Sequence, residues 1–333
     1  MGCTGSVIRI EVGFDSPWRL GGVRNMGIDL KRISEGKQKR EPRVLVYGGD
    51  GVGKTRFSAG APDPFFIDVN RGSVEYDVKR VIPETWTEVL EWVNAVAAGS
   101  VKCKTLVIDS ISDLEHMGHA EFFPNTTIDK WDGGYGRGET YALSRWRELL
   151  SSLERVWMAG KTVILVGHMT IKRFDDPTGP GYERYEVAAR QKLAGLLRQW
   201  VDYVLFAKEE VAQQKVGGET KAVTSGTRWI HTQRCPAFDA KSRGTTLFPE
   251  RVLLSWDEFA RARAAETARV DELRKEIDTM LVEINDKSLN EMVKEYLRAN
   301  PGMVVEARNS VAARLEKARA EKSAAATNAS AAQ

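Results

Sequence analysis

The stretch RVLVYGGDGVGKT, residues 43–55, constrains the fold of this chain more than any other. Its first six residues form an apolar run that ends in glycine, which predicts a buried strand. The loop that follows fits the pattern G-x-x-x-x-G-K-[ST], with Gly48, Gly53, Lys54 and Thr55 at the fixed positions. Such a loop requires a strand before it and a helix after it, so we expect a strand–loop–helix unit within an α/β fold.

The residue types of this loop suit a bound phosphate. Glycines let backbone amides curl around an anion without Cβ clashes. Lys54 can reach the β- and γ-phosphates, and Thr55 can ligate Mg²⁺. We therefore predict ATP and Mg²⁺ as cofactors. The predicted nucleotide-binding residues are Gly48, Gly49, Asp50, Gly51, Val52, Gly53, Lys54, Thr55 and Arg56.

Apolar runs and amphipathic segments alternate along the chain. Their order predicts a mostly parallel sheet flanked by helices, because parallel strands need helical crossovers. A small β-hairpin is expected at 222–235, and a helical C-terminal tail from about 257. The predicted strands are 43–48, 64–69, 104–110, 162–169 and 203–210, and the predicted helices are 85–99, 141–161 and about 188–201.

Composition and patterning also divide the chain. Residues 1–25 lack periodicity and read as a non-native or disordered extension, whereas Met26 opens a more regular stretch. The core is expected over 26–258, the helical tail over 259–320, and a disordered end over 321–333. A net charge of +3 neither demands nor excludes nucleic acid. Scattered cysteines and the lack of a membrane-length run predict a cytoplasmic protein without a membrane partner.

Two further residues are expected at the phosphate site. Asp109 ends the apolar run TLVID, where it can hold the water shell of Mg²⁺ opposite Thr55; the alternative is a cap on the next helix. His168 follows TVILVG and can contact the γ-phosphate; the alternative is a structural histidine. The predicted catalytic residues are thus Lys54, Asp109 and His168, and the predicted metal ligands are Thr55 and Asp109.

Seven motifs in one order resemble a known family. They are RVLVYGGDGVGKT, FFIDVNRGS, TLVIDSI, GGYGRG, VILVGHMTIKRFDDPTGPGYERYEV, VDYVLFAKEE and HTQRCPAFDAKSR. Together they resemble phage nucleotide-binding proteins with a short RecA-like core, a family that includes single-strand annealing and recombination ATPases. The resemblance covers 26–258 and implies a RecA-like P-loop NTPase fold. It places the phosphate loop on 48–55, the magnesium aspartate on Asp109 and the γ-phosphate sensor on His168.

The same resemblance implies partners. The segment 170–185 falls where RecA-like proteins bind DNA, and its alternation around the turn signal DDPTGPG predicts an exposed hairpin. Its aromatic residues can stack on bases and its cations can hold phosphates. The candidate DNA contacts are Lys172, Arg173, Phe174, Tyr182 and Arg184. Lys241 and Arg243 fall where related ring and filament ATPases present basic fingers to a neighbouring subunit.

One position departs from the family pattern. RecA-like ATPases place a catalytic Glu shortly after the second strand, and here that position is Asn70. An amide can orient water but cannot accept its proton. Asp68 and Glu75 are the acids nearest in sequence. The pattern therefore predicts nucleotide binding more firmly than fast hydrolysis.

The leading hypothesis is an ATP-binding, ATP-hydrolysing phage protein that acts on single-stranded DNA in recombination or strand annealing. It would self-associate into a ring or filament, and a single-strand binding protein is a further candidate partner. The alternatives are a nucleotide-gated module that binds a partner protein in phage DNA metabolism, and a small-molecule kinase. A kinase would carry an acceptor pocket, for which the sequence offers no clear motif.

Overall fold

The computed structural model describes residues 40–177, 179–216, 219–245 and 247–331. The expectations for residues 1–25 and for Met26 lie outside the described residues. The strands are β1 Arg43–Gly48, β2 Pro64–Asp68, β3 Lys79–Val81, β4 Thr105–Asp109, β5 Thr162–Phe174, β6 Tyr182–Val187, β7 Tyr203–Val216, β8 Glu219–His231, β9 Lys241–Ser242 and β10 Arg251–Leu253. The helices are α1 Lys54–Ala59, α2 Trp86–Ala97, α3 Ile111–Phe122, α4 Arg137–Met158, α5 Gln191–Trp200, α6 Trp256–Ile284, α7 Lys287–Ala299 and α8 Val304–Ala331.

Within the described ranges the strands form one ten-stranded sheet, in the order β10-β8-β7-β1-β5-β4-β2-β3. The six strands from β7 to β3 in this order are parallel, whereas β8 and β10 are antiparallel additions. Strand β5 lies between β1 and β4, so the strands that carry Gly48 and Asp109 end at the same edge. This confirms the predicted mostly parallel sheet.

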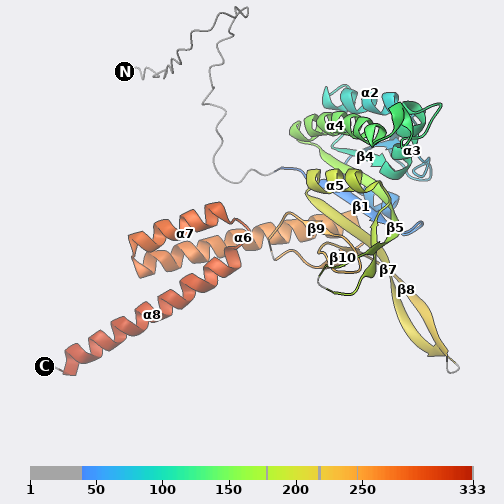
Figure 1. Ribbon diagram of the computed structural model, residues 1–333. Helices are drawn as coiled ribbons and strands as arrows, with labels where there is room; N and C mark the ends of the chain where they lie inside the picture. Colours follow the sequence, from blue (N-terminus) through green and yellow to red (C-terminus); the bar gives the residue numbers. More distant parts are fainter. Residues whose placement is uncertain (1–39, 178, 217–218, 246, 332–333) are drawn as a thin grey trace, which may run out of the picture. The chain divides into compact units, whose positions relative to one another are not determined.

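Both faces of the sheet are covered, as expected for parallel strands whose residues are buried throughout. Alternate residues of β1 point to opposite faces: Leu45 and Tyr47 join one buried cluster, while Val44 and Val46 join another. Helices α2, α3, α4 and α5 cover the first face (Figure 1). Phe57 of α1 and Phe259 of α6 fill the second.

Two hairpins extend the sheet, and one of them differs from its prediction. Strand β7 continues to Val216 and pairs with β8 along a long antiparallel ribbon that extends past the parallel strands (Figure 1). The expected hairpin within 222–235 is therefore wrong, because that segment's partner is the strand before it. The second hairpin, β5–β6, is confirmed: Met169 pairs with Val187 and Phe174 with Tyr182.

The C-terminal region is helical, as predicted, and joins the sheet through α6. Trp256 and Phe259 in its first turn are buried with the core of the sheet. Further along, α6, α7 and α8 share a separate apolar cluster that includes Leu273, Ile277 and Val311. Helix α8 continues to Ala331, where the sequence predicted disorder from 321. Among helices of the described ranges, none is long and apolar enough to cross a membrane.

Candidate functional site

The phosphate loop lies between β1 and α1, and its glycines are required by the local geometry. A Cβ atom at Gly48 would come within 2.2 Å of the carbonyl oxygen of Ala207 on the neighbouring strand. Gly51 and Gly53 have φ angles of 70° and 109°, a region that other residues rarely adopt. Val52 is buried among apolar side chains and anchors the loop. The remaining members, Gly49, Asp50 and Arg56, lie at the more accessible outer side of the loop.

The Lys54 ammonium lies under this loop without a carboxylate in contact. It donates to the carbonyl oxygens of Gly48 and Gly49, at 3.0 and 2.8 Å, and the residue is only 7% exposed. Burial lowers the pKa of Lys54, while Asp50 and Asp109 act in the opposite direction. A buried cation that is held only by neutral carbonyls is poorly compensated. An anion in the loop would supply the missing charge.

Thr55 and Asp109 meet across the sheet edge. The Thr55 hydroxyl donates to Oδ2 of Asp109 at 2.6 Å, although 54 residues separate them. Burial raises the pKa of Asp109, and the hydrogen bond from Thr55 acts in the opposite direction. A hydroxyl and a carboxylate oxygen are ligands that suit Mg²⁺. The donor set thus fits Mg²⁺, and its role as a metal site stays a prediction.

His168 adjoins the phosphate loop, because its backbone pairs directly with Gly48 in the sheet. Its Nδ1 lies 2.7 Å from Oδ1 of Asp50, and its Nε2 lies 3.5 Å from Oδ2 of Asp113. The hydrogen bond with His168 holds the pKa of Asp50 below its usual range. The sequence pointed to Asp50 only as a loop residue and missed Asp113. The spacing Ser110-x-x-Asp113 at a helix start was the available signal.

Asn70 stands where the family resemblance places a catalytic glutamate, and the two nearest acids in sequence, Asp68 and Glu75, lie in different environments. Asp68 is fully buried and accepts hydrogen bonds from the backbone of Gly72 and from the backbone and hydroxyl of Ser73. Those three donors occupy it, so it is not available as a base. Asn70 is exposed and accepts from Gly72 at 2.9 Å. Glu75 is exposed at the following turn.

The predicted DNA contacts of the β5–β6 hairpin form two groups, those with partners inside the chain and those that are accessible. Arg184 is 3% exposed and lies between Glu186 and Asp239, at 3.6 and 3.5 Å. This burial argues against its expected role in holding DNA phosphates. Lys172 donates to the carbonyl oxygen of Ala189 and is also committed within the chain.

The outer residues of the hairpin remain accessible. The Arg173 side chain is 74% exposed, with Asp175 as its ion-pair partner at 3.3 Å. Phe174 and Tyr182 are half-buried and face each other at the end of the paired region, with ring centroids 5.3 Å apart. Of the five expected DNA contacts, these three are placed where a large ligand can reach them.

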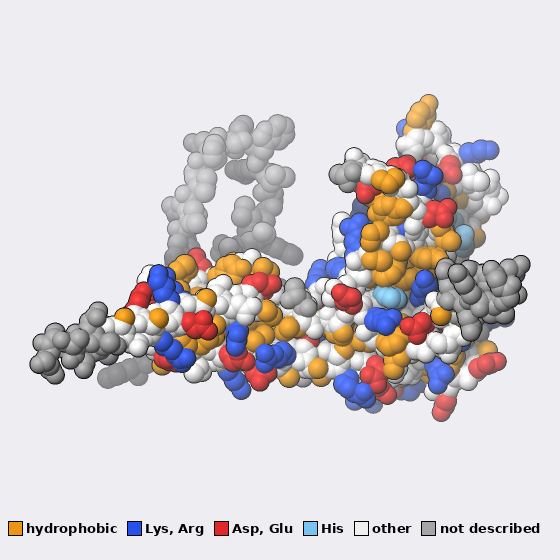
Figure 2. Space-filling model, turned by 90° about the horizontal axis from the view of Figure 1, so that it is seen from below, with side chains coloured by type: hydrophobic (Ala, Val, Ile, Leu, Met, Phe, Trp, Pro, Cys, Tyr) orange, Lys and Arg blue, Asp and Glu red, His pale blue; other side chains and the backbone are white. Residues whose placement is uncertain are grey.

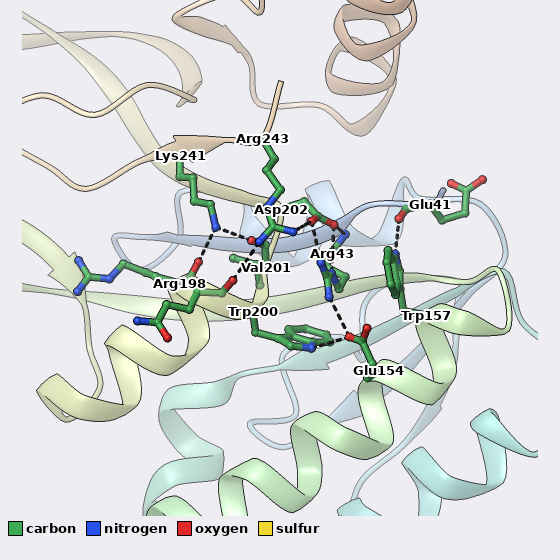
Figure 3. A network of polar contacts seen from close by, with 11 residues as sticks. Glu41, Arg43, Glu154, Trp157, Arg198, Trp200, Val201, Asp202, Lys241 and Arg243 are labelled. Carbon is green, nitrogen blue, oxygen red and sulfur yellow. Dashed lines mark hydrogen bonds and ion pairs between the residues drawn. The ribbon is translucent and has the colours of Figure 1, made fainter. Parts of the chain in front are cut away.

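Lys241 and Arg243 lie at the opposite edge of the sheet, at the amino ends of the parallel strands (Figure 3). Lys241 donates to the carbonyl oxygens of Arg198 and Val201, both at 2.7 Å. Arg243 binds Asp202 at 3.0 Å, yet its side chain is 54% exposed. The structure thus gives Lys241 an internal role. A contact with a neighbouring subunit stays a prediction, for which Arg243 is the better-placed residue.

Residues 40–244 match a family model described as an AAA domain. The flagellar accessory protein FlaH from Methanocaldococcus jannaschii is similar in structure, with a TM-score of 0.34 and 10% identity over 64% of this chain and 84% of FlaH. A KaiC-like protein from Pyrococcus horikoshii OT3 gives a TM-score of 0.31 and 18% identity over 58% of this chain and 78% of its own. No curated protein sequence shows a significant match.

Proposed function

The chain belongs to the family of AAA domains, and from this premise we propose that it hydrolyses Mg-ATP and uses the nucleotide to control binding to single-stranded DNA. Its fold is that of a RecA-like P-loop ATPase. The finer role, in phage recombination or strand annealing, is supported by the motifs from the phosphate loop to AKSR. Assembly into a ring or filament is part of the same proposal, with Arg243 as a candidate contact between subunits.

The nucleotide part of the proposal is supported by three adjoining groups. Lys54 is a buried cation without a carboxylate in contact, and Thr55 and Asp109 present paired oxygens beside it. ATP would bring the phosphate charge that Lys54 lacks. Thr55 and Asp109 are the residues that would hold Mg²⁺. When bound, the metal would neutralise charge that develops on the phosphate oxygens.

The observation that carries the DNA part is the continuity of β5. This 13-residue strand begins in the buried sheet, passes the phosphate loop at His168 and continues as the first arm of the hairpin. A change at the γ-phosphate position would act on His168. The strand would then transmit a shift of His168 to the hairpin, which begins at Met169 and is paired as far as Phe174, six residues from His168. The position of the hairpin would therefore change with the nucleotide that is bound.

A second accessible feature lies on the same edge of the sheet. Tyr135 in the segment GGYGRG is 96% exposed and has a φ angle of 51°, which is rare for an aromatic residue. Asp129, four residues before this segment, forms an ion pair with Arg190 after β6, at 2.9 Å. An exposed aromatic ring suits stacking on an unpaired base. Tyr135, Phe174 and Tyr182 are thus the aromatic candidates.

Charge alone does not select the partner. Basic and acidic side chains are mixed over the described part of the face drawn in Figure 2. Arg184 and Lys172 are bound within the chain, which lowers the number of cations available to a phosphate backbone. The alternative of a nucleotide-gated module that binds a protein partner is therefore kept as an outcome of the test.

The test uses Arg173→Ala in the full chain, with fluorescence anisotropy on a labelled single strand. With ATP present, the variant should bind more weakly, and the slope of log affinity against log salt should fall by about one. Arg261→Ala is the matched control, because that side chain is 70% exposed and pairs with Glu258 on α6. The control should keep both the wild-type affinity and the wild-type slope.

Two further outcomes separate the hypotheses. Single-strand binding that does not change between ATP-bound and nucleotide-free protein would contradict nucleotide control. Binding of ATP without measurable affinity for single strands would contradict the DNA part and favour the protein-interaction module.

A further inference from the structure

A group that takes a proton from the attacking water assists ATP hydrolysis, and Asn70 stands where the family resemblance places that group. Asp68 is occupied by three donors, so the nearest buried acid does not replace the missing glutamate. Resting on the proposed ATPase function, we infer that His168 is this base and that Asp50 of the phosphate loop is its positioning residue.

The contact between Asp50 and His168 fixes which nitrogen of the ring is free. An ionised carboxylate can only accept, so the bond at 2.7 Å requires His168 to donate from Nδ1. In a neutral ring Nε2 then carries the lone pair. His168 sits beside Gly48 in the sheet, and its half-exposed side chain, at 33%, leaves room for water. Asp50 thus holds the ring in the form that accepts a proton at Nε2.

Charged side chains of both signs lie near the ring of His168. Asp113 of α3 lies 3.5 Å from Nε2, so a proton taken up there meets a second carboxylate. Asp109 at the end of β4 lies within electrostatic range of the same ring. Lys54 is the nearby cation, and it interacts with both Asp50 and Asp109. Among the described residues, three carboxylates and one lysine therefore lie near the ring, and a proton that reaches Nε2 enters a site where acidic groups outnumber basic ones.

The step balances without another reactant. The water oxygen forms a bond to the γ-phosphorus while the bond from that phosphorus to the β,γ-bridging oxygen breaks. One water proton passes to Nε2 of His168, and ADP leaves with the electron pair of the broken bond. The imidazolium then returns its proton to phosphate or solvent, and the enzyme is restored. A positioned base of this kind accelerates a reaction by typically 10²–10⁴-fold.

Among the described residues, the Asp50 side chain forms one ion pair, with His168, 118 residues away, and it is 88% exposed. An exposed acid in a loop that binds phosphates repels the ligand, so a function that needs the acid is required to account for it. Holding the proton acceptor is such a function.

The experiment compares His168→Gln and Asp50→Asn in the full chain, each by steady-state hydrolysis over a range of pH and by calorimetry with ATP. The His168→Gln variant should lose about 10²-fold in kcat, while its ATP affinity stays near the wild-type value. The fall of wild-type kcat at low pH, which follows protonation of an imidazole, should disappear in this variant. Asp50→Asn should lose about tenfold in kcat, because a neutral amide holds the His168 ring less firmly than a carboxylate does.

A double variant and a control complete the design. The two substitutions together should cost little more than His168→Gln alone, because the pair acts as one unit. Asp63→Asn is the matched control: Asp63 is also an exposed aspartate in an ion pair, with Lys79 at 2.8 Å, and it should keep the wild-type rate. Asp50→Glu should recover part of the loss.

The outcomes distinguish this inference from the proposed function. A His168→Gln variant that keeps the wild-type rate, or the same dependence on pH, overturns the inference and leaves the ATPase intact. A wild-type chain that binds ATP without turning it over overturns the inference and the hydrolytic part of the proposed function together. Unchanged ATP affinity after Lys54→Ala would instead remove the nucleotide site itself.

Discussion

The buried cations Arg43 and Lys54 lie at opposite ends of the parallel strands and have different kinds of partners. At the amino ends of the strands, Arg43 binds Asp202 through two nitrogens and Glu154 through a third, at 2.8–3.2 Å (Figure 3). Its guanidinium also lies over the ring of Trp157, 4.1 Å from the centroid. At the carboxyl ends, Lys54 has only carbonyl oxygens and Asp109 has a hydroxyl.

Both edges bury a cation, and Arg43 has carboxylates in contact whereas Lys54 is held by carbonyl oxygens, as is the less buried Lys241 at the amino ends. A buried cation that already contacts two carboxylates has a structural role, because any ligand would have to displace those partners. A buried cation without a carboxylate in contact costs stability until an anion arrives. The incomplete compensation of the deeply buried Lys54 therefore distinguishes the phosphate loop from the Arg43 network. Substitutions at the two edges test this contrast, from the largest expected effect to the smallest.

Arg43→Ala should destabilise the protein strongly while leaving the phosphate site intact. The substitution leaves Asp202, whose side chain is 15% exposed, without its main partner. Breaking a buried pair in this way costs about 3–5 kcal/mol of the free energy of unfolding, measured by urea denaturation. The matched control is Arg243→Ala, which removes a second and more exposed partner of Asp202 and should cost about 1 kcal/mol or less. Similar losses for the two variants would show that the network does not depend on Arg43.

Lys54→Ala should have the reverse signature. The variant should lose ATP affinity by about two orders of magnitude or more by calorimetry, since a desolvated charge–phosphate contact is removed. The stability of the nucleotide-free protein should stay the same or rise, because the substitution removes a buried and poorly compensated cation. Thermal unfolding with and without Mg-ATP measures both effects, and a large loss of stability without nucleotide would assign Lys54 to the fold.

Asp109→Asn should give the smallest change in the free energy of unfolding. The dependence of this change on pH tests whether Asp109 is an uncompensated charge. Burial raises the pKa of Asp109, so folding takes up a proton, and this contribution is lost as the pH rises through the raised value. The nucleotide-free variant should therefore be more stable than the wild type at neutral pH, by about 2–4 °C in Tm for each kcal/mol recovered.

Below the ordinary pKa of a carboxyl group, the two proteins should have the same stability. Addition of Mg-ATP should stabilise the wild type and not Asp109→Asn. A variant that is less stable than the wild type at neutral pH would contradict the view that this edge carries uncompensated charge.

Local features of the chain are encoded in short stretches of its sequence. The strand at 43–48, the strand that ends at Asp109 and the buried first half of β5 follow from apolar runs, and the glycine loop follows from residues that only a tight loop needs. The hairpin 170–187 is also predictable, because its two arms and its turn are adjacent in sequence. In each case the deciding interactions lie within a few residues of one another.

Only the tertiary structure decided which partner each charge received. The pairing of β7 with β8 was missed because nothing in 222–235 specifies the strand it joins. Arg184 carries the positive charge that a contact with DNA phosphate needs. The fold, however, places Asp239 beside Arg184 and buries the Arg184 side chain. Asp50 and His168 meet only because β1 and β5 are neighbours in the sheet. The sequence by itself determined which chemical groups lie at the ends of the strands. The order of the strands in the sheet decided which of those groups neutralise each other and which are left for a ligand. The reason is that electrostatic interactions depend on distance in space and not on separation along the chain.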